Sequence, residues 1–169
     1  MKTIIMTFFL SFSVLIGFAQ EKTKQQIKEE QKAIKQKEVE ALVDSKEYEF
    51  VADRANPQGT RSIDMTTNDN FFRFKKDSIH SEMPFFGRAY SGVAYGGGGG
   101  GLDFEGPMKD YSIVKGKKDY TIKVDVRGDS ESYSILLKVF FNGNASLTIN
   151  SSNRSPINYN GKIDKLKKE

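Results

Sequence analysis

The sequence predicts a mainly β protein, an antiparallel meander that forms a small barrel or a two-layer sandwich, preceded by one N-terminal helix. Residues Tyr120–Arg127 alternate apolar and polar side chains without a fault, which is the pattern of a half-buried strand. Asn142-Gly143 follows the next apolar run and is a strong hairpin signal. The run Glu21–Asp44 contains neither Gly nor Pro and is rich in Lys, Glu, Gln and Ala, which favour helix. These patterns leave the choice between barrel and sandwich open.

The beginning of the chain has the layout of a secretory signal peptide, expected over residues 1–19. A positive charge at Lys2 precedes the apolar run Thr3–Phe18, and small residues precede Gln20, so we expect cleavage after Ala19. The apolar run is shorter than the roughly 20 residues of a membrane-spanning helix, which disfavours an uncleaved anchor. We therefore expect an exported protein, periplasmic or secreted, that meets the membrane only through its signal peptide. The absence of cysteine excludes a lipoprotein, disulfides and thiolate chemistry.

Residues 20–45 are predicted to form a charged helical spacer. Ile27, Ile34 and Ala41 recur every seven residues, but the positions between them are polar, so a coiled coil is not expected. Only the last third can dock on a core, through Val39, Leu42 and Val43. The net charge of +4 is small and lysines alternate with glutamates, which argues against nucleic acid as a partner.

Residues 46–163 are predicted to form the β-rich domain, and residues 164–169 a charged tail. The strand over Tyr133–Phe141 is expected to turn at Asn142-Gly143 in a type I′ turn, with both central residues at positive φ, and to return through Leu147 and Ile149. Weaker strands are expected at Phe50–Arg54, Arg61–Thr66, Asn70–Lys75, Ser78–Glu82, Leu102–Glu105 and Met108–Lys115, and an edge strand at Asn158–Ile163.

The connection Pro84–Gly106 is the best candidate for a site, because it combines five aromatic residues, one arginine and six consecutive glycines. A glycine run is costly to order, so it indicates close backbone approach or a moving loop. If the segment is extended, Phe86, Arg88 and Tyr90 share a face. Arg88 is either an anion clamp stacked on the rings or a structural residue that satisfies loop carbonyls. The candidate ligand-binding residues are Phe85, Phe86, Arg88, Tyr90, Tyr95, Gly96, Gly97, Gly98, Gly99, Gly100 and Gly101.

Two segments carry a resemblance to a known family. They are FVADRANPQG at Phe50–Gly59 and PFFGRAYSGVAYGGGGGGLDF at Pro84–Phe104. With the signal peptide and the YTIKVDV strand, they resemble an exported Bacteroidota family of unknown function, domain of unknown function 4251. The resemblance covers roughly Val39–Ile163. It implies a β-rich fold and the envelope of a Gram-negative bacterium, and it implies no activity.

No catalytic residue, metal or cofactor is predicted. Asp103 and Glu105 lie two apart on one side of a strand and are expected to form a solvated face, although such a pair can do acid–base chemistry or bind a hard cation. His80 is the only histidine and is expected at the surface near a strand end. The glycine run is no phosphate loop, because strand-like residues follow it.

The expected function is therefore a non-enzymatic binding module for an unknown small or extended ligand, or for an envelope protein, through residues 84–106. The alternative is a structural or protein-interaction domain, and a hydrolase using Asp103, Glu105 and Arg88 ranks third. A ligand-binding barrel predicts an apolar pocket lined by Phe85, Phe86, Tyr90 and Tyr95. An interaction domain predicts a packed interior and an exposed apolar patch.

Overall fold

The computed structural model describes residues 23–90, 100–129 and 131–167. The chain divides into two units, residues 1–33 and 34–169. The signal peptide expected over residues 1–19 lies outside the described residues. Among those that are described, no helix is long and apolar enough to cross a membrane.

Helix α2 (Lys24–Ser45) occupies the segment whose composition favours helix. Its first turn is capped reciprocally: the backbone N of Gln26 donates to Thr23 Oγ1 (3.3 Å), and the backbone N of Thr23 donates to Gln26 Oε1 (2.9 Å). This capping box provides partners for backbone donors at the helix start.

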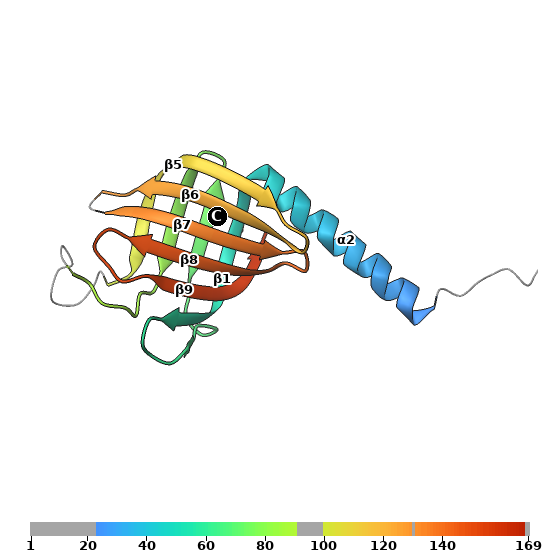
Figure 1. Ribbon diagram of the computed structural model, residues 1–169, viewed down its shortest axis with the longest axis horizontal. Helices are drawn as coiled ribbons and strands as arrows, with labels where there is room; N and C mark the ends of the chain where they lie inside the picture. The colour runs from blue at the N-terminus through green and yellow to red at the C-terminus, as the bar shows by residue number, and fades with distance from the viewer. Residues whose placement is uncertain (1–22, 91–99, 130, 168–169) are drawn as a thin grey trace, which may run out of the picture. The chain divides into compact units, whose positions relative to one another are not determined.

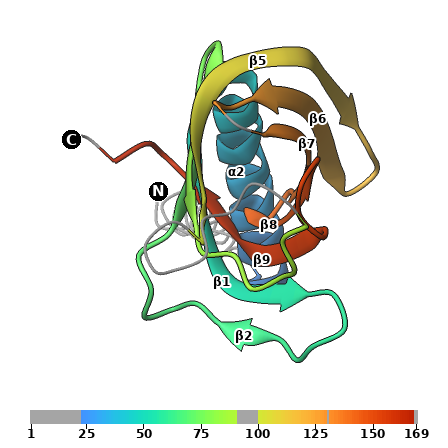
Figure 2. The same cartoon turned by 90° about the vertical axis from the view of Figure 1, so that its left-hand side faces the viewer.

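The strands of the second unit are each antiparallel to their neighbours (Figure 1). In chain order they are β1 (Glu47–Pro57), β2 (Ile63–Asp64), β3 (Phe71–Lys75), β4 (Ser78–Met83), β5 (Leu102–Lys115), β6 (Asp119–Arg127), β7 (Ser132–Phe140), β8 (Asn144–Ser151) and β9 (Ile157–Asp164). β1 also pairs with β9, from Glu49 opposite Asp164 to Pro57 opposite Ile157. This pairing closes eight strands into a barrel, with the two-residue β2 beside β1 (Figure 2). Of the two architectures left open by the sequence, the barrel is the one formed.

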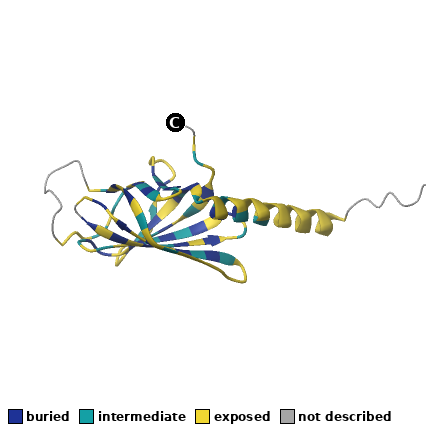
Figure 3. Cartoon of the chain, turned by 90° about the horizontal axis from the view of Figure 1, so that it is seen from above, coloured by how far each residue is buried: buried dark blue, intermediate teal, exposed yellow. Residues whose placement is uncertain are grey.

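Buried residues alternate with exposed ones along the strands (Figure 3), and the buried side chains form the hydrophobic core. Ile122, Ile135, Leu137 and Leu147 are at most 1% exposed, as the alternation of their strands predicts. Aromatic rings fill much of the remaining volume: Tyr48, Phe50, Phe72, Phe74, Phe104, Tyr120, Tyr133 and Tyr159 are all buried. The domain therefore has a packed core where a ligand-binding barrel would have a cavity.

One side chain completes the barrel wall. β1 pairs with β3 up to Phe50 opposite Phe72, and farther along the same edge it pairs with β2. Between these pairings, the backbone N of Ala52 donates to Asn70 Oδ1 (2.7 Å), and Asn70 Nδ2 donates to the carbonyl O of Ala52 (3.1 Å). The buried Asn70 amide thus replaces a backbone pair of the ladder, because an unpaired buried backbone group is costly.

Two strand predictions are corrected by the structure. The separate strands expected at Leu102–Glu105 and Met108–Lys115 form one strand, β5, which runs through Gly106 and Pro107. A Cβ at Gly106 would lie 2.6 Å from the carbonyl O of Arg127, so glycine permits close strand contact here and does not mark a break. The strand expected over Arg61–Thr66 is reduced to the two residues of β2.

The hairpin at Asn142-Gly143 is confirmed, but its turn type is wrong. Of this pair only Gly143 has a positive φ (89°), whereas a type I′ turn needs both. β7 ends at Phe140, whose carbonyl O accepts from Gly143 N (2.9 Å), so three residues connect the strands. The Asn142 side chain accepts from the backbone N of Asn144 (3.0 Å), a role that needs no positive φ at Asn142.

The last turns of α2, residues 34–45, cover one end of the barrel. Val39 and Val43 are each 1% exposed and belong to the core, as the pattern of the last third predicts. Glu40 forms an ion pair with Lys115 at the end of β5. We call the end covered by residues 34–45 the helix end of the barrel. These residues turn apolar side chains toward the core and charged side chains toward solvent.

Candidate functional site

The segment singled out by the sequence lies at the opposite end of the barrel. It leaves β4 at Met83 and enters β5 at Leu102, and these two residues face each other in the ladder. The β6–β7 turn and the β8–β9 connection lie at this same end, because successive connections of an antiparallel meander alternate between ends. We call it the loop end.

Residues 88–90 of the segment pair with the β8–β9 connection in an extended conformation. Ala89 forms an antiparallel bridge with Arg154. The backbone N of Tyr90 donates to the carbonyl O of Asn153 (2.8 Å), and the backbone N of Ser155 donates to the carbonyl O of Arg88 (2.8 Å). Ser155 Oγ also accepts from the backbone N of Arg88 (3.0 Å).

Besides Ala89, residues 84–90 of the segment expose three large side chains to solvent. Phe86 is 36% exposed and Tyr90 69% exposed, and Arg88 between them is also exposed. We call Phe86, Arg88 and Tyr90 the exposed row. Arg88 and Tyr90 share a face because they flank the bridging Ala89 in an extended segment.

Gly87 is closely packed against two side chains. A Cβ at this position would lie 2.4 Å from Ser155 Oγ and 2.5 Å from the Phe85 ring. Glycine here lets the exposed row approach the β8–β9 connection, so its role differs from the mobility that a glycine-rich loop suggests.

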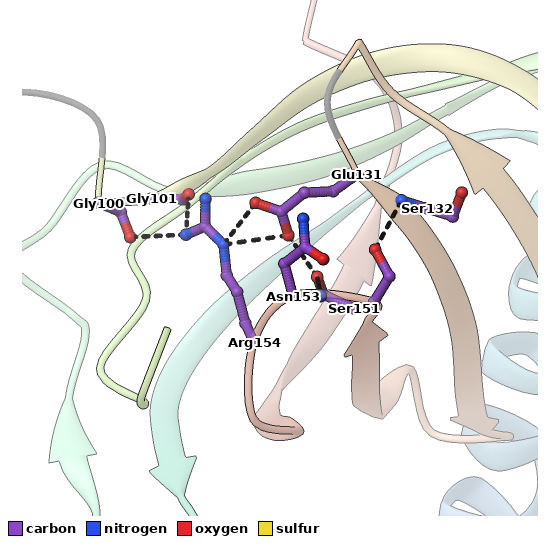
Figure 4. A network of polar contacts seen from close by, with 8 residues as sticks. Gly100, Gly101, Glu131, Ser132, Ser151, Asn153 and Arg154 are labelled. Carbon is purple, nitrogen blue, oxygen red and sulfur yellow. Dashed lines mark hydrogen bonds and ion pairs between the residues drawn. The ribbon is translucent and has the colours of Figure 1, made fainter. Parts of the chain in front are cut away.

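Arg154 of the β8–β9 connection forms a buried ion pair with Glu131 (Figure 4). The Arg154 side chain is 8% exposed and that of Glu131 3%, and Arg154 Nε donates to both carboxylate oxygens, at 3.0 and 3.3 Å. Arg154 Nη1 donates to the carbonyl oxygens of Gly100 (3.0 Å) and Gly101 (2.7 Å). Ser151 Oγ donates to Glu131 Oε2. One guanidinium thus ties the end of the glycine run to the turn before β7.

Arg154 takes the structural role that the sequence left open for Arg88. Its guanidinium carbon lies 5.3 Å from the centre of the Phe85 ring, within cation–π range, and its N–H groups satisfy loop carbonyls. Arg88, in contrast, is held through its backbone. The signal missed in the sequence is an opposite charge pair, Glu131 and Arg154, in connections that a meander brings to the same end.

Two tyrosines support this end from inside the barrel. Tyr159 Oη donates to the carbonyl O of Pro84 (2.7 Å), and burial raises its pKa. The ring of Tyr133 stacks on Phe104 with 3.8 Å between centroids. Burial, and secondarily the Glu131 carboxylate, raise the pKa of Tyr133 to about 12, although Arg154 opposes the rise.

The acidic residues of the segment lie on the outer wall. Asp103 and Glu105 are both exposed on one face of β5, as expected, opposite Glu82 and His80 of β4. Burial and the neighbouring Glu82 raise the pKa of Asp103, and Arg154 partly offsets this. Glu105 Oε1 lies 3.9 Å from Lys75 Nζ of β3.

His80 lies in the middle of β4, which corrects its expected place near a strand end. It is half-buried against the Phe71 ring (5.0 Å between centroids), and its Nε2 lies 3.4 Å from Glu82 Oε1. Within residues 23–90, 100–129 and 131–167, no three His, Cys, Asp or Glu side chains group as metal ligands.

The remaining predicted site residues divide into two groups. Tyr95 and Gly96–Gly99 lie outside the described residues. Gly100 is exposed and Gly101 half-buried, and both contribute carbonyls to Arg154. The structure thus brings Phe85, Arg88 and Gly101 to one end of the barrel, around an arginine that was not predicted.

Comparison with known proteins identifies relatives without a known activity. The family described as Domain of unknown function (DUF4251) matches residues 30–163. The fold is similar to the crystal structure of a DUF4251 family protein from Bacteroides eggerthii DSM 20697, with 20% identity, 79% of this chain and 89% of that chain covered, and a TM-score of 0.61. No curated protein matches the chain.

Proposed function

The chain belongs to the DUF4251 family, and we propose that it is an exported, non-enzymatic binding module of the cell envelope. In this proposal an extended ligand binds along the exposed row at the loop end. The proposed export rests on the signal-peptide pattern of residues 1–19.

The observation that carries the proposal is the contrast between the exposed row and the interior. The interior is filled by aromatic side chains such as Phe50, Phe72 and Tyr159, each fully buried, which is the packed interior that an interaction domain predicts, so the ligand proposed here binds on the surface. On that surface, Tyr90 is 69% exposed beside the Ala89–Arg154 bridge, and Phe86 is 36% exposed just before the bend at Gly87. Exposed aromatic side chains on a fixed backbone lose little conformational freedom when a ligand binds.

The chemistry of the row indicates the class of ligand. The rings of Phe86 and Tyr90 offer flat apolar faces, and the Arg88 guanidinium offers a fork that matches a carboxylate or phosphate. The buried Arg154 supplies the loop contacts that an arginine here would otherwise make, which leaves the Arg88 side chain available. The row therefore suits an extended ligand with an anionic group between two flat segments.

Native mass spectrometry of the protein purified from its own host tests the proposal. We expect a retained ligand mass on the wild type that is lost from the double variant Phe86→Ser/Tyr90→Ser and reduced at least tenfold in Arg88→Lys. Phe140→Ser is the matched control, because Phe140 is 38% exposed at the end of β7, away from the row. A ligand retained equally by all variants, or none on the wild type, would overturn the proposal.

A further inference from the structure

The second half of β5 has a strand on only one side. Its first half, Leu102–Pro107, pairs with β4, and from Met108 onward it pairs with β6 (Figure 1). In the described part of the chain, no strand pairs with the other edge of Met108–Lys115. We call Ser112–Lys115 the open edge; it lies toward the helix end, away from the exposed row.

The backbone pattern indicates which groups face the open edge. Met108 N donates to the carbonyl O of Asp77 (2.7 Å), so the Met108 backbone points away from β6. Lys109 lies opposite Asp125 in the ladder to β6. A bulge at Asp110, with φ 50°, then shifts the register by one residue, so that Ser112 lies opposite Lys123 and its backbone points to β6 as that of Lys109 does. Because ladder residues alternate, the N–H and C=O groups of Ile113 point to the open edge.

The side chains of the open edge are uncovered on both faces of the strand. Ile113 is 40% exposed and Val114 is 64% exposed, and they point to opposite faces. Helix α2 and the residue after it contact this half of β5 at Lys115, through Glu40, and at Tyr111, where Lys46 Nζ lies 4.4 Å from the ring centre. An uncovered edge with apolar side chains is a template for a further strand.

Charge selects among the possible strands. Between residues 109 and 118 there are four lysines and one aspartate, and Glu40 of α2 forms an ion pair with Lys115, so the net charge at this edge is +2. A second copy would bring lysines against lysines, whereas an acidic strand would bring opposite charges together. We propose that the open edge accepts an extended acidic segment of a partner protein as an added strand. This surface is independent of the ligand proposed for the exposed row.

Peptide titration followed by amide NMR tests the proposal on the full mature chain. The probe is an eight-residue synthetic peptide in which glutamate alternates with valine and threonine, and its control carries lysine at each glutamate. We expect the acidic peptide to bind at least tenfold more tightly than the basic one at low salt, with the largest shifts at the amides of Ile113 and Lys115. The preference should shrink in 0.5 M NaCl, because salt screens exposed charges.

Two variants locate the binding. Ile113→Pro removes an N–H that faces the open edge while sparing the ladder to β6, so the fold should persist and acidic-peptide affinity should fall at least tenfold. Lys117→Glu/Lys118→Glu changes only exposed side chains of the β5–β6 turn and should give the same loss of affinity. This variant tests the proposal if the proline variant does not fold. Equal binding of both peptides, shifts confined elsewhere, or unchanged affinity in a folded variant would overturn the proposal. Shifts with anionic phospholipid vesicles and none with the peptide would overturn it in favour of a membrane surface.

Discussion

The two ends of the barrel are covered by different physical means. At the helix end, Val39 and Val43 bury apolar side chains, and the ion pair Glu40–Lys115 lies at the surface. At the loop end, the cover is held by the buried pair Arg154–Glu131 and by hydrogen bonds to backbone. Apolar contact is non-directional, whereas a buried ion pair requires one geometry. The loop end is therefore the one that fixes side chains in defined positions.

The largest expected effect comes from breaking the buried ion pair. Glu131→Ala leaves the Arg154 guanidinium buried without its partner, and we expect a loss of about 3–5 kcal/mol in the free energy of unfolding. Urea denaturation measures it. Replacing both partners, with Glu131→Leu and Arg154→Met, should recover part of the loss, because no uncompensated charge remains, although the carbonyl oxygens of Gly100 and Gly101 lose their donor. A loss below about 1 kcal/mol in the single variant would contradict a desolvated pair.

Truncating the apolar cover should cost less. Val43→Ala removes two buried methyl groups from the helix end, and we expect a loss of roughly 2–3 kcal/mol by the same measurement. The control is Ile34→Ala in the same helix, which is 53% exposed and should change stability little. Equal losses in the two variants would mean that the helix end is not covered by Val43.

Gly87→Ala tests close packing at the loop end. The added Cβ would overlap Ser155 Oγ and the Phe85 ring, so we expect a loss of roughly 1–3 kcal/mol. Gly100→Ala is the matched control, since a Cβ there meets nothing within 4 Å. Loss of stability in both variants would contradict a packing effect at Gly87, because Ala at an uncrowded position lowers the entropy of the unfolded chain and should not destabilise the fold.

Alkaline pH should weaken the loop end through Tyr133. Its folded pKa of about 12 exceeds the unfolded value of about 10, so the folded state holds the proton longer and stability falls as pH rises through this window. Solvent screening reduces the effect, and Tyr133→Phe should avoid a loss of roughly 1 kcal/mol between pH 9.5 and 12. Tyr90→Phe, with an exposed ring, should follow the wild type. Parallel pH profiles for all three proteins would contradict the assignment.

The smallest effect is expected from the surface ion pair of the helix end. The hydrogen bond from Lys115 lowers the pKa of Glu40, yet both side chains remain substantially exposed. Glu40→Gln should leave the unfolding midpoint within replicate scatter at 0.15 M salt, since exposed pairs contribute little. A midpoint shift comparable to that of Glu131→Ala would remove the contrast between the two ends.

The β architecture was largely predictable because its signals are local. Alternation gave the faces of Ile122, Ile135 and Leu147, and the Asn142-Gly143 hairpin was recognisable although its turn type was not. Barrel closure was not predictable, because the pairing of β1 with β9 depends on strand curvature that no local pattern contains. The continuity of β5 through Gly106-Pro107 was missed because the same dipeptide usually ends a strand.

The composition of the segment led to Phe86, Arg88 and Tyr90 as candidate site residues, and their function stays a prediction. The buried charge pair at the same end of the barrel was not predicted. Arg154 lies 66 residues after Arg88 in an unremarkable polar connection, and its partner Glu131 lies in another. The pair becomes visible only when the two connections are seen side by side in the structure, because a charge can be buried only where a partner of opposite charge lies beside it.

Closure of the barrel by β1 and β9 determines when the protein can fold. Glu49 finds its partner Asp164 only 115 positions later in the chain, so the ring cannot be completed until the last strand is available. Contacts between such distant residues fold slowly, because a long loop must close before they form. This order would suit the proposed export. A chain that enters a translocation channel from its N-terminus could not close the barrel, and would stay unfolded, until its last strand had passed through.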